Sequence, residues 1–188
     1  MTENLLSINE FSRPGKKLSE VLGIVMHWTA NPNVSAENNR LYFDSRKNGK
    51  LGYGSAHYII GLSGEVIRCI PDQEVAYHVG SSQIDPASGK IYTDLARERF
   101  GAYASTNNSP NNCTIGIELC PIDWEGNFNP ATIEAAIDLC ATLCRAFRLK
   151  ARDVVTHHEV VGWKDCPRLW TNHPEYLENF RAEVEKRI

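Results

Sequence analysis

No apolar run in this chain of 188 residues approaches the ~20 residues that a membrane-spanning helix needs. The N-terminal stretch MTENLLSINEFSRPGKK has no basic segment followed by an apolar one, which is the pattern of a secretory leader. The chain also has no lysine- and arginine-rich run, and its net charge is −3. We therefore expect a protein without a membrane span, made in the cytoplasm, that does not bind nucleic acid.

Internal repeats, low-complexity tracts and linker-like stretches are also missing from the sequence. Hydrophobic residues make up 42% and charged residues 23%, which is ordinary for a folded globular protein. One domain of this length buries roughly 70% of its unfolded surface, so the core needs no disulfide or metal staple. We expect a single catalytic domain spanning residues 1–188, and a monomer, because no exposed apolar stripe requires a partner.

The cysteines lack the paired C-x-x-C spacing of a closed structural metal site. Cys140 and Cys144 share one face of a predicted helix, and Cys113 and Cys120 flank an extended segment whose ends lie ~23 Å apart at about 3.3 Å per residue. We interpret these four and Cys69 as reduced, core-filling side chains. The sixth cysteine, Cys166, lies instead in the stretch THHEVVGWKDCP, close to two histidines and a lysine.

Hydrophobic periodicity predicts strands at residues 21–30, 55–61, 65–70, 112–121 and 153–158, with a hairpin turn at Gly64. A 3.6-residue period predicts a long helix that begins at Pro130, capped by Asn129, and a C-terminal helix over 174–188. Two further helices are expected at 35–48 and near 93–100. In the first of these, Leu41, Tyr42 and Phe43 are expected to form the apolar side.

Strands interleaved with helices indicate an α/β fold with a central mixed β-sheet flanked by helices. In such folds functional residues gather where strands end, and His27, Glu118 and His158 all lie at or near predicted strand ends. Residues 81–111 are rich in Ser, Asn, Pro and Gly and form a longer connection than a compact domain needs. We expect this segment to be a wall or lid of the functional site.

A catalytic zinc site needs three protein ligands and one open position. His27, His158 and Cys166 can supply the three ligands, the last two lying eight residues apart in THHEVVGWKDCP. Glu118 offers a buried carboxylate for proton transfer, and Lys164 offers a positive charge for a developing oxyanion. This set of residues predicts metal-assisted hydrolysis with one catalytic Zn²⁺.

Five motifs in order, IVMHWTA, SAHYIIG, AYHVG, NNCTIGIEL and THHEVVGWKDCP, resemble the type 2 zinc-dependent N-acetylmuramoyl-L-alanine amidases. That family includes phage endolysins, bacterial autolysins and the peptidoglycan recognition proteins, and the resemblance covers roughly residues 21–170. It implies the amidase fold, peptidoglycan as partner, and hydrolysis of the amide between N-acetylmuramic acid and L-alanine. It also implies zinc ligands at a His ending the first strand, a later His, and a Cys just beyond it.

The family pattern H-x5-K-x-C selects His158 as the second histidine ligand, because it fits His158, Lys164 and Cys166. Alternation along a strand agrees that only one of two adjacent histidines can face the metal, so we expect His157 to face the packing side. The family often places a catalytic Tyr where this chain has Ala56. The resemblance therefore implies Glu118 as the general base.

The AYHVG motif lines the substrate groove in that family, so we assign a substrate contact to His78. Tyr77 and Trp28 are assigned substrate contacts as apolar faces for sugar or lactyl groups. His57 is expected to be structural. Two alternatives stay open: a non-catalytic peptidoglycan-binding module, and a cysteine hydrolase with Cys166 as nucleophile and His158 as base. The site of action is expected to be the cell wall, reached by a holin-dependent or other non-Sec route, or as a fragment of a longer chain.

Overall fold

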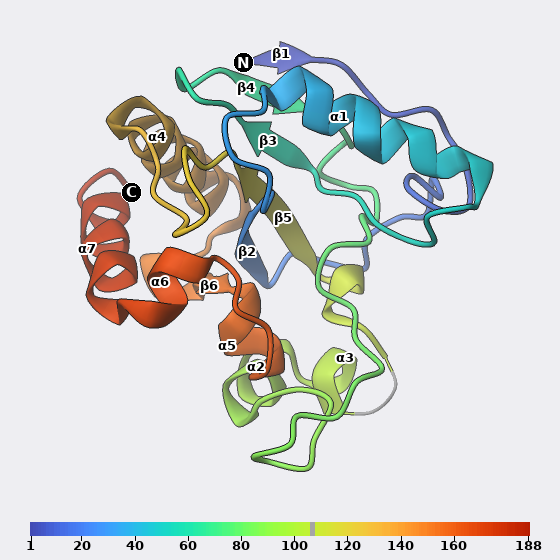
Figure 1. Cartoon of the computed structure of the whole chain (residues 1–188). Helices are drawn as coiled ribbons and strands as arrows, with labels where there is room; N and C mark the ends of the chain where they lie inside the picture. The colour runs from blue at the N-terminus through green and yellow to red at the C-terminus, as the bar shows by residue number, and fades with distance from the viewer. Residues whose placement is uncertain (106–107) are drawn as a thin grey trace.

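The computed structural model describes residues 1–105 and 108–188. Its centre is a six-stranded sheet in the order β1-β4-β3-β5-β2-β6 (Figure 1). Only β3 and β4 are antiparallel, and all other neighbouring pairs are parallel. The strands are β1 (Thr2–Glu3), β2 (Gly23–Trp28), β3 (Tyr58–Ile60), β4 (Val66–Arg68), β5 (Thr114–Leu119) and β6 (Val154–Thr156).

Helices lie on both faces of this sheet, so the predicted α/β class with a mixed sheet is confirmed. The α-helices are α1 (Ala36–Ser45), α2 (Asp94–Phe100), α3 (Ala102–Ser105), α4 (Pro130–Phe147), α5 (His157–Val161), α6 (Arg168–Asn172) and α7 (Pro174–Glu185). Three 3₁₀ turns complete the described elements: η1 (Arg46–Asn48), η2 (Pro110–Asn112) and η3 (Ala151–Asp153). None of the helices among the described residues is long and apolar enough to cross a membrane.

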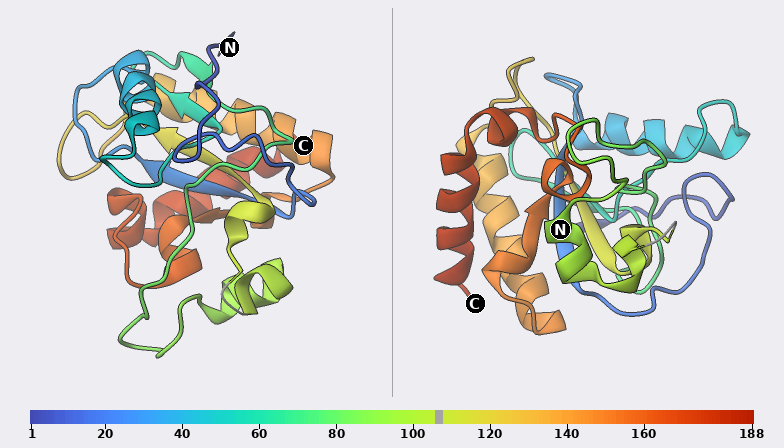
Figure 2. Two further views of the ribbon diagram at one scale, coloured as in Figure 1. Left: turned by 90° about the vertical axis from the view of Figure 1, so that its right-hand side faces the viewer. Right: turned by 90° about the horizontal axis from the view of Figure 1, so that it is seen from below.

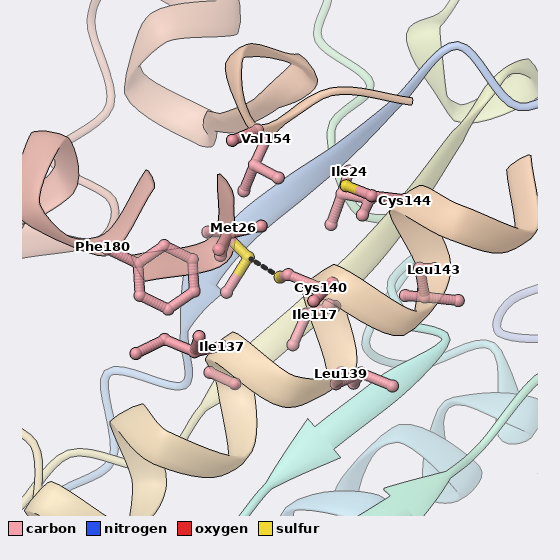
Figure 3. Close-up of a cluster of buried hydrophobic side chains, with 14 of the residues drawn as sticks. Ile24, Met26, Ile117, Ile137, Leu139, Cys140, Leu143, Cys144, Val154 and Phe180 are labelled. Atoms are coloured by element: carbon pink, nitrogen blue, oxygen red, sulfur yellow. Dashed lines mark hydrogen bonds between the residues drawn. The ribbon is translucent and has the colours of Figure 1, made fainter. Parts of the chain in front are cut away.

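One face of the sheet is covered by α4 and α7, which lie side by side in Figures 1 and 2. Helix α4 begins at Pro130, and the apolar residues of the helix pack against the sheet. There the thiol of Cys140 lies 3.7 Å from the sulfur of Met26 (Figure 3). As expected from periodicity, the buried side chains of α7 are Leu177, Phe180 and Val184. Each buried aliphatic or aromatic side chain of this layer contributes about 1.5–3 kcal/mol relative to an exposed one.

Helices cover the opposite face at its two ends, and between them the ring of His78 lies over Gly116 of β5. At one end Ala36 of α1 packs on Ile59 and Ile67, and at the other end α2 and α5 pack around Val25 and Val155. Figure 1 shows α1 and α2 well separated on this side. The middle of this face is therefore free to carry polar groups.

Two local expectations are wrong. The side of α1 that meets the protein does not contain Leu41 and Tyr42, which are 50% and 48% exposed. The helix instead buries Arg40, because the carbonyl oxygens of Asn4 and Leu5 accept hydrogen bonds from its guanidinium. The strand predicted over 153–158 ends at Thr156, where α5 begins.

The six cysteines are all buried and free. Within the expected site wall at 81–111, α2 occupies the place of the helix predicted near 93–100. Residues 106 and 107 of that segment lie outside the described residues.

Candidate metal centre and hydrolytic site

Alternation along two neighbouring strands sets the floor of the site. In β2 and β5, Ile24, Met26, Ile115 and Ile117 point into the core beneath α4 and α7. Side chains at the intervening positions emerge on the other face, between α1 and α2. His27 and Glu118 are direct neighbours in the parallel register, so this face carries an imidazole and a carboxyl side by side.

Two further donors converge on His27. Its Nδ1 lies 3.1 Å from Nδ1 of His157 and 3.8 Å from Sγ of Cys166. The three donor atoms all lie within 4.8 Å of one another, and all three residues are buried. A tetrahedral zinc ion with bonds of about 2.0–2.3 Å requires ligand atoms ~3.3–3.6 Å apart. Two of the separations, 3.1 and 3.8 Å, lie near this range, and two imidazoles with a thiol are donors that zinc uses, so these residues fit one zinc ion.

The structure corrects the choice between the adjacent histidines, because His157 and not His158 faces His27 and Cys166. The alternation argument fails because the strand ends at Thr156 and both histidines belong to the first turn of α5. His158 turns toward the following loop, where its Nδ1 donates to the carbonyl of Lys164 and its backbone N–H donates to the carbonyl of Cys166. It holds that loop and offers no donor to the cluster.

The position of His157 depends on a capping box at the start of α5. Thr156 accepts from the backbone N–H of Glu159, and the carboxylate of Glu159 accepts from the backbone N–H of Thr156. Arg181 of α7 binds the same carboxylate at 2.8 Å and donates to the carbonyl of Val154. Helix α7 thus fixes the junction between β6 and α5, where His157 lies.

Burial sets the protonation of the three donors. Loss of solvent lowers the pKa of His27 well below its ordinary value and lowers the pKa of His157 to about 3. Both imidazoles are therefore neutral and able to bind a metal. Burial raises the pKa of Cys166 to about 12, which opposes its use as a free thiolate nucleophile. A bound cation reverses this preference, because a coordinating thiol is deprotonated.

Glu118 and Lys164 complete the centre of the site. Burial raises the pKa of Glu118 to about 8, and the charge of Lys164 opposes this shift. The Oε2 atom of Glu118 is buried without a hydrogen-bond partner among the described residues. An unpaired carboxyl oxygen of this kind is poised to exchange a proton with a ligand.

Two hollows that share several lining residues open beside this site. One, of about 450 Å³, is lined by Tyr77 and His78 together with Glu118 and His157. The other, of about 260 Å³, contains Trp28 next to His27 and Cys166. Glu118, Lys164 and His78 line both, so the expected contact residues Tyr77, Trp28 and His78 all lie along one groove.

The groove also includes residues that sequence reasoning missed. Tyr53 stacks edge-on against Tyr77 with ring centroids 5.3 Å apart, and Arg46 and Phe43 border both hollows. No motif marks these positions, because they come together only through the loop after α1. Ser81, Ser82 and Asn111 also line the larger hollow, so both described ends of the 81–111 segment reach it.

His57 has no free ring nitrogen. Its Nδ1 accepts from the backbone N–H of Gly116, and its Nε2 donates to the carbonyl of Glu74. Burial lowers its pKa to about 4, which agrees with a neutral ring that ties the start of β3 to its neighbours. These contacts support the structural role expected for it.

Comparison with known proteins shows which family of sequences this chain resembles. The family model described as N-acetylmuramoyl-L-alanine amidase matches residues 17–169. A probable N-acetylmuramoyl-L-alanine amidase of Bacillus licheniformis is 36% identical and aligns over 97% of this chain and 46% of its own length. The N-acetylmuramoyl-L-alanine amidase BlyA of Bacillus subtilis (strain 168) is 32% identical over 100% of this chain and 47% of its own. The chain thus spans about half the length of these curated relatives.

Solved structures share the fold. A mutant endolysin from Bacillus subtilis matches with a TM-score of 0.69 at 21% identity, covering 97% of this chain and 96% of that one. The structure of PlyL matches with a TM-score of 0.70 at 18% identity, covering 98% of this chain and 96% of that one. The sheet and its flanking helices therefore have the same fold as these two structures.

Proposed function

Because this chain belongs to the N-acetylmuramoyl-L-alanine amidase family, we propose that it hydrolyses the amide bond between N-acetylmuramic acid and L-alanine in peptidoglycan. The observation that carries this proposal is the convergence of His27, His157 and Cys166 beside a carboxyl group, within a groove. The place of action is then the cell wall.

We propose zinc as the cofactor, held by Nδ1 of His27, Nδ1 of His157 and Sγ of Cys166. Two neutral imidazoles and one thiolate are a donor set that zinc uses in catalytic sites. When bound, zinc supplies Lewis-acid polarisation of the scissile carbonyl and of the attacking water. The groove beside the donors leaves room for a substrate to approach them.

Glu118 is the proposed general base. Its unpartnered Oε2 takes a proton from the attacking water and returns it to the nitrogen of the departing L-alanine. The pKa of Glu118, about 8, lies close to neutral pH, so this carboxyl can both take up and release a proton. The positive charge of Lys164 favours its ionised form. Lys164 also faces the negative charge that develops on the carbonyl oxygen.

Mass spectrometry of digested peptidoglycan tests the activity. We expect the zinc-loaded chain to release stem peptides with a free N-terminal L-alanine and glycans with a free lactyl carboxyl group. Glu118→Gln is the matched control, since it preserves shape but removes the base. Products cut within the glycan or within the stem peptide would overturn the assignment, and intact peptidoglycan with bound zinc-loaded protein would indicate a binding module.

A further inference from the structure

A second histidine lies behind the proposed metal centre. Nε2 of His27, the ring nitrogen that faces away from His157 and Cys166, is 3.0 Å from Nδ1 of His78. The two rings are nearly perpendicular, at 89°, with centroids 5.2 Å apart. His78 therefore contacts His27 on the side opposite the proposed zinc.

The hydrogen-bond partners of His78 fix which of its nitrogens carries the proton. Its Nε2 lies 3.3 Å from the carbonyl oxygen of Thr114, which can only accept. The hydroxyl of Thr114, 3.2 Å from the same nitrogen, already donates to the carbonyl of Pro110 at 2.7 Å. His78 therefore carries its proton on Nε2, and its Nδ1 is left as an acceptor.

That arrangement fixes His27 in turn. With Nδ1 of His78 as acceptor, Nε2 of His27 must be the donor, so Nδ1 of His27 keeps its lone pair. This is the atom that meets His157 and Cys166. We infer that His78 is a positioning residue that holds His27 in the tautomer and orientation required for zinc, an inference that rests on the proposed zinc site.

Two further contacts hold His78 itself. The backbone N–H of His78 donates to Oδ1 of Asn111. Its ring lies over Gly116 of β5 so closely that a Cβ at position 116 would come within 2.5 Å of the ring. The absence of a side chain at Gly116 thus makes room for the ring beside His27.

Zinc affinity, measured by competition with a chromophoric chelator, tests this role without any assay of hydrolysis. Hydrogen bonds behind a metal ligand typically contribute about 10–100-fold in affinity. We expect His78→Phe, which keeps a ring but removes the acceptor, to weaken zinc binding by that factor. His78→Asn places an Oδ1 acceptor near the position of Nδ1 and should recover most of the loss, and Gly116→Ala should weaken binding by displacing the ring.

Long-range ¹H–¹⁵N NMR of the zinc-free protein gives a second readout. The wild type should show His27 protonated on Nε2, and His78→Phe should show both tautomers. His173→Phe, at an exposed histidine that lines neither hollow, is the control and should change neither readout. Unchanged affinity in His78→Phe, no recovery in His78→Asn, or a wild-type His27 protonated on Nδ1 would overturn the inference. A wild type that binds no zinc would instead overturn the zinc site.

Discussion

The Nδ1 atoms of His27 and His157 lie 3.1 Å apart although 130 residues separate them along the chain. They meet because β2 and β6 are parallel neighbours, with Met26 paired to Thr156, so the residue after each partner emerges at the same edge of the sheet. His158 holds the loop that brings Cys166 to the same point. Its backbone N–H donates to the carbonyl of Cys166, and its ring donates to the carbonyl of Lys164.

Replacement of the two adjacent histidines should separate their roles. We expect His157→Ala to abolish stoichiometric zinc binding, because it removes a donor from a three-ligand set. His158→Ala should retain zinc, because its Nδ1 donates to the carbonyl of Lys164 and its ring supplies no donor to the cluster of His27, His157 and Cys166. Metal analysis of the two purified variants gives the answer, and zinc lost from His158→Ala but kept by His157→Ala would reverse the assignment.

Glu118→Gln should fold and keep zinc but lose hydrolysis. General-base catalysis typically contributes 10²–10⁴-fold, so we expect a fall of at least about 100-fold in the rate of amide cleavage. The amide replaces a carboxyl whose Oε2 is buried without a hydrogen-bond partner in the described part of the chain, so packing is preserved. A variant with wild-type turnover of purified cell walls would exclude Glu118 as the base.

Lys164→Met should also retain zinc, since it removes a charge and leaves the three donors in place. Loss of one oxyanion contact typically costs ~10²–10³ in turnover. Comparison of kcat and KM distinguishes this role from substrate binding, because a transition-state contact lowers kcat. An effect confined to KM would assign Lys164 to binding instead.

Arg181 links α7 to the cap of α5, so Arg181→Met should lower the free energy of unfolding by about 1–3 kcal/mol, as expected for a charged hydrogen bond with little exposure. Zinc affinity should fall with it, because the cap positions His157. Lys186→Met is the matched control, since its ion pair with Glu183 is exposed. Equal stability of the two variants in urea titrations would contradict this link.

The two-point ion pair of Arg13 and Glu74, with N–O distances of 2.8 and 2.9 Å, is expected to make a pH-dependent contribution to the stability of the fold. The hydrogen bond from Arg13 lowers the pKa of Glu74 below its ordinary 4.5. A lowered carboxyl pKa stabilises the fold above the unfolded value, and that stabilisation is lost as the pH falls through the folded value.

Arg13→Met should therefore destabilise the protein at pH 7, and the difference from wild type should shrink well below pH 4.5. Urea unfolding at pH 7 and well below pH 4.5 measures this difference in the free energy of unfolding. Lys90→Met, which removes an exposed pair with Asp94, should show little difference at either pH. A wild-type advantage that persists unchanged in acid would show that the side-chain packing of Arg13, not its charge, is responsible.

Most strands of the sheet and the long helices were predictable because their periodicity is strong, whereas the two-residue edge strand β1 was not predicted. β2, β5, the β3–β4 hairpin, α4 and α7 all lie within the ranges expected from apolar patterning. The orientation of α1 was not predictable, because it buries Arg40 against carbonyl groups of the N-terminal segment, a contact that no local pattern reveals.

Within the site, residue types were easier to predict than their directions. His27, Glu118, Lys164 and Cys166 were found from strand ends and motif spacing, and the structure brings them into one groove. The choice between His157 and His158 depended on where a strand becomes a helix, and a shift of one residue reverses it. The contact of His78 with His27 depends on the folded path of residues 71–80 and has no sequence signature.

The composition of the metal centre is the claim on which the rest of this account depends. Anomalous diffraction at the zinc edge, from crystals of the zinc-loaded protein, tests it most directly. We expect one peak within bonding distance of Nδ1 of His27, Nδ1 of His157 and Sγ of Cys166, with no fourth protein donor. A peak bound by His158, a site closed by a fourth side chain, or zinc located elsewhere would contradict it.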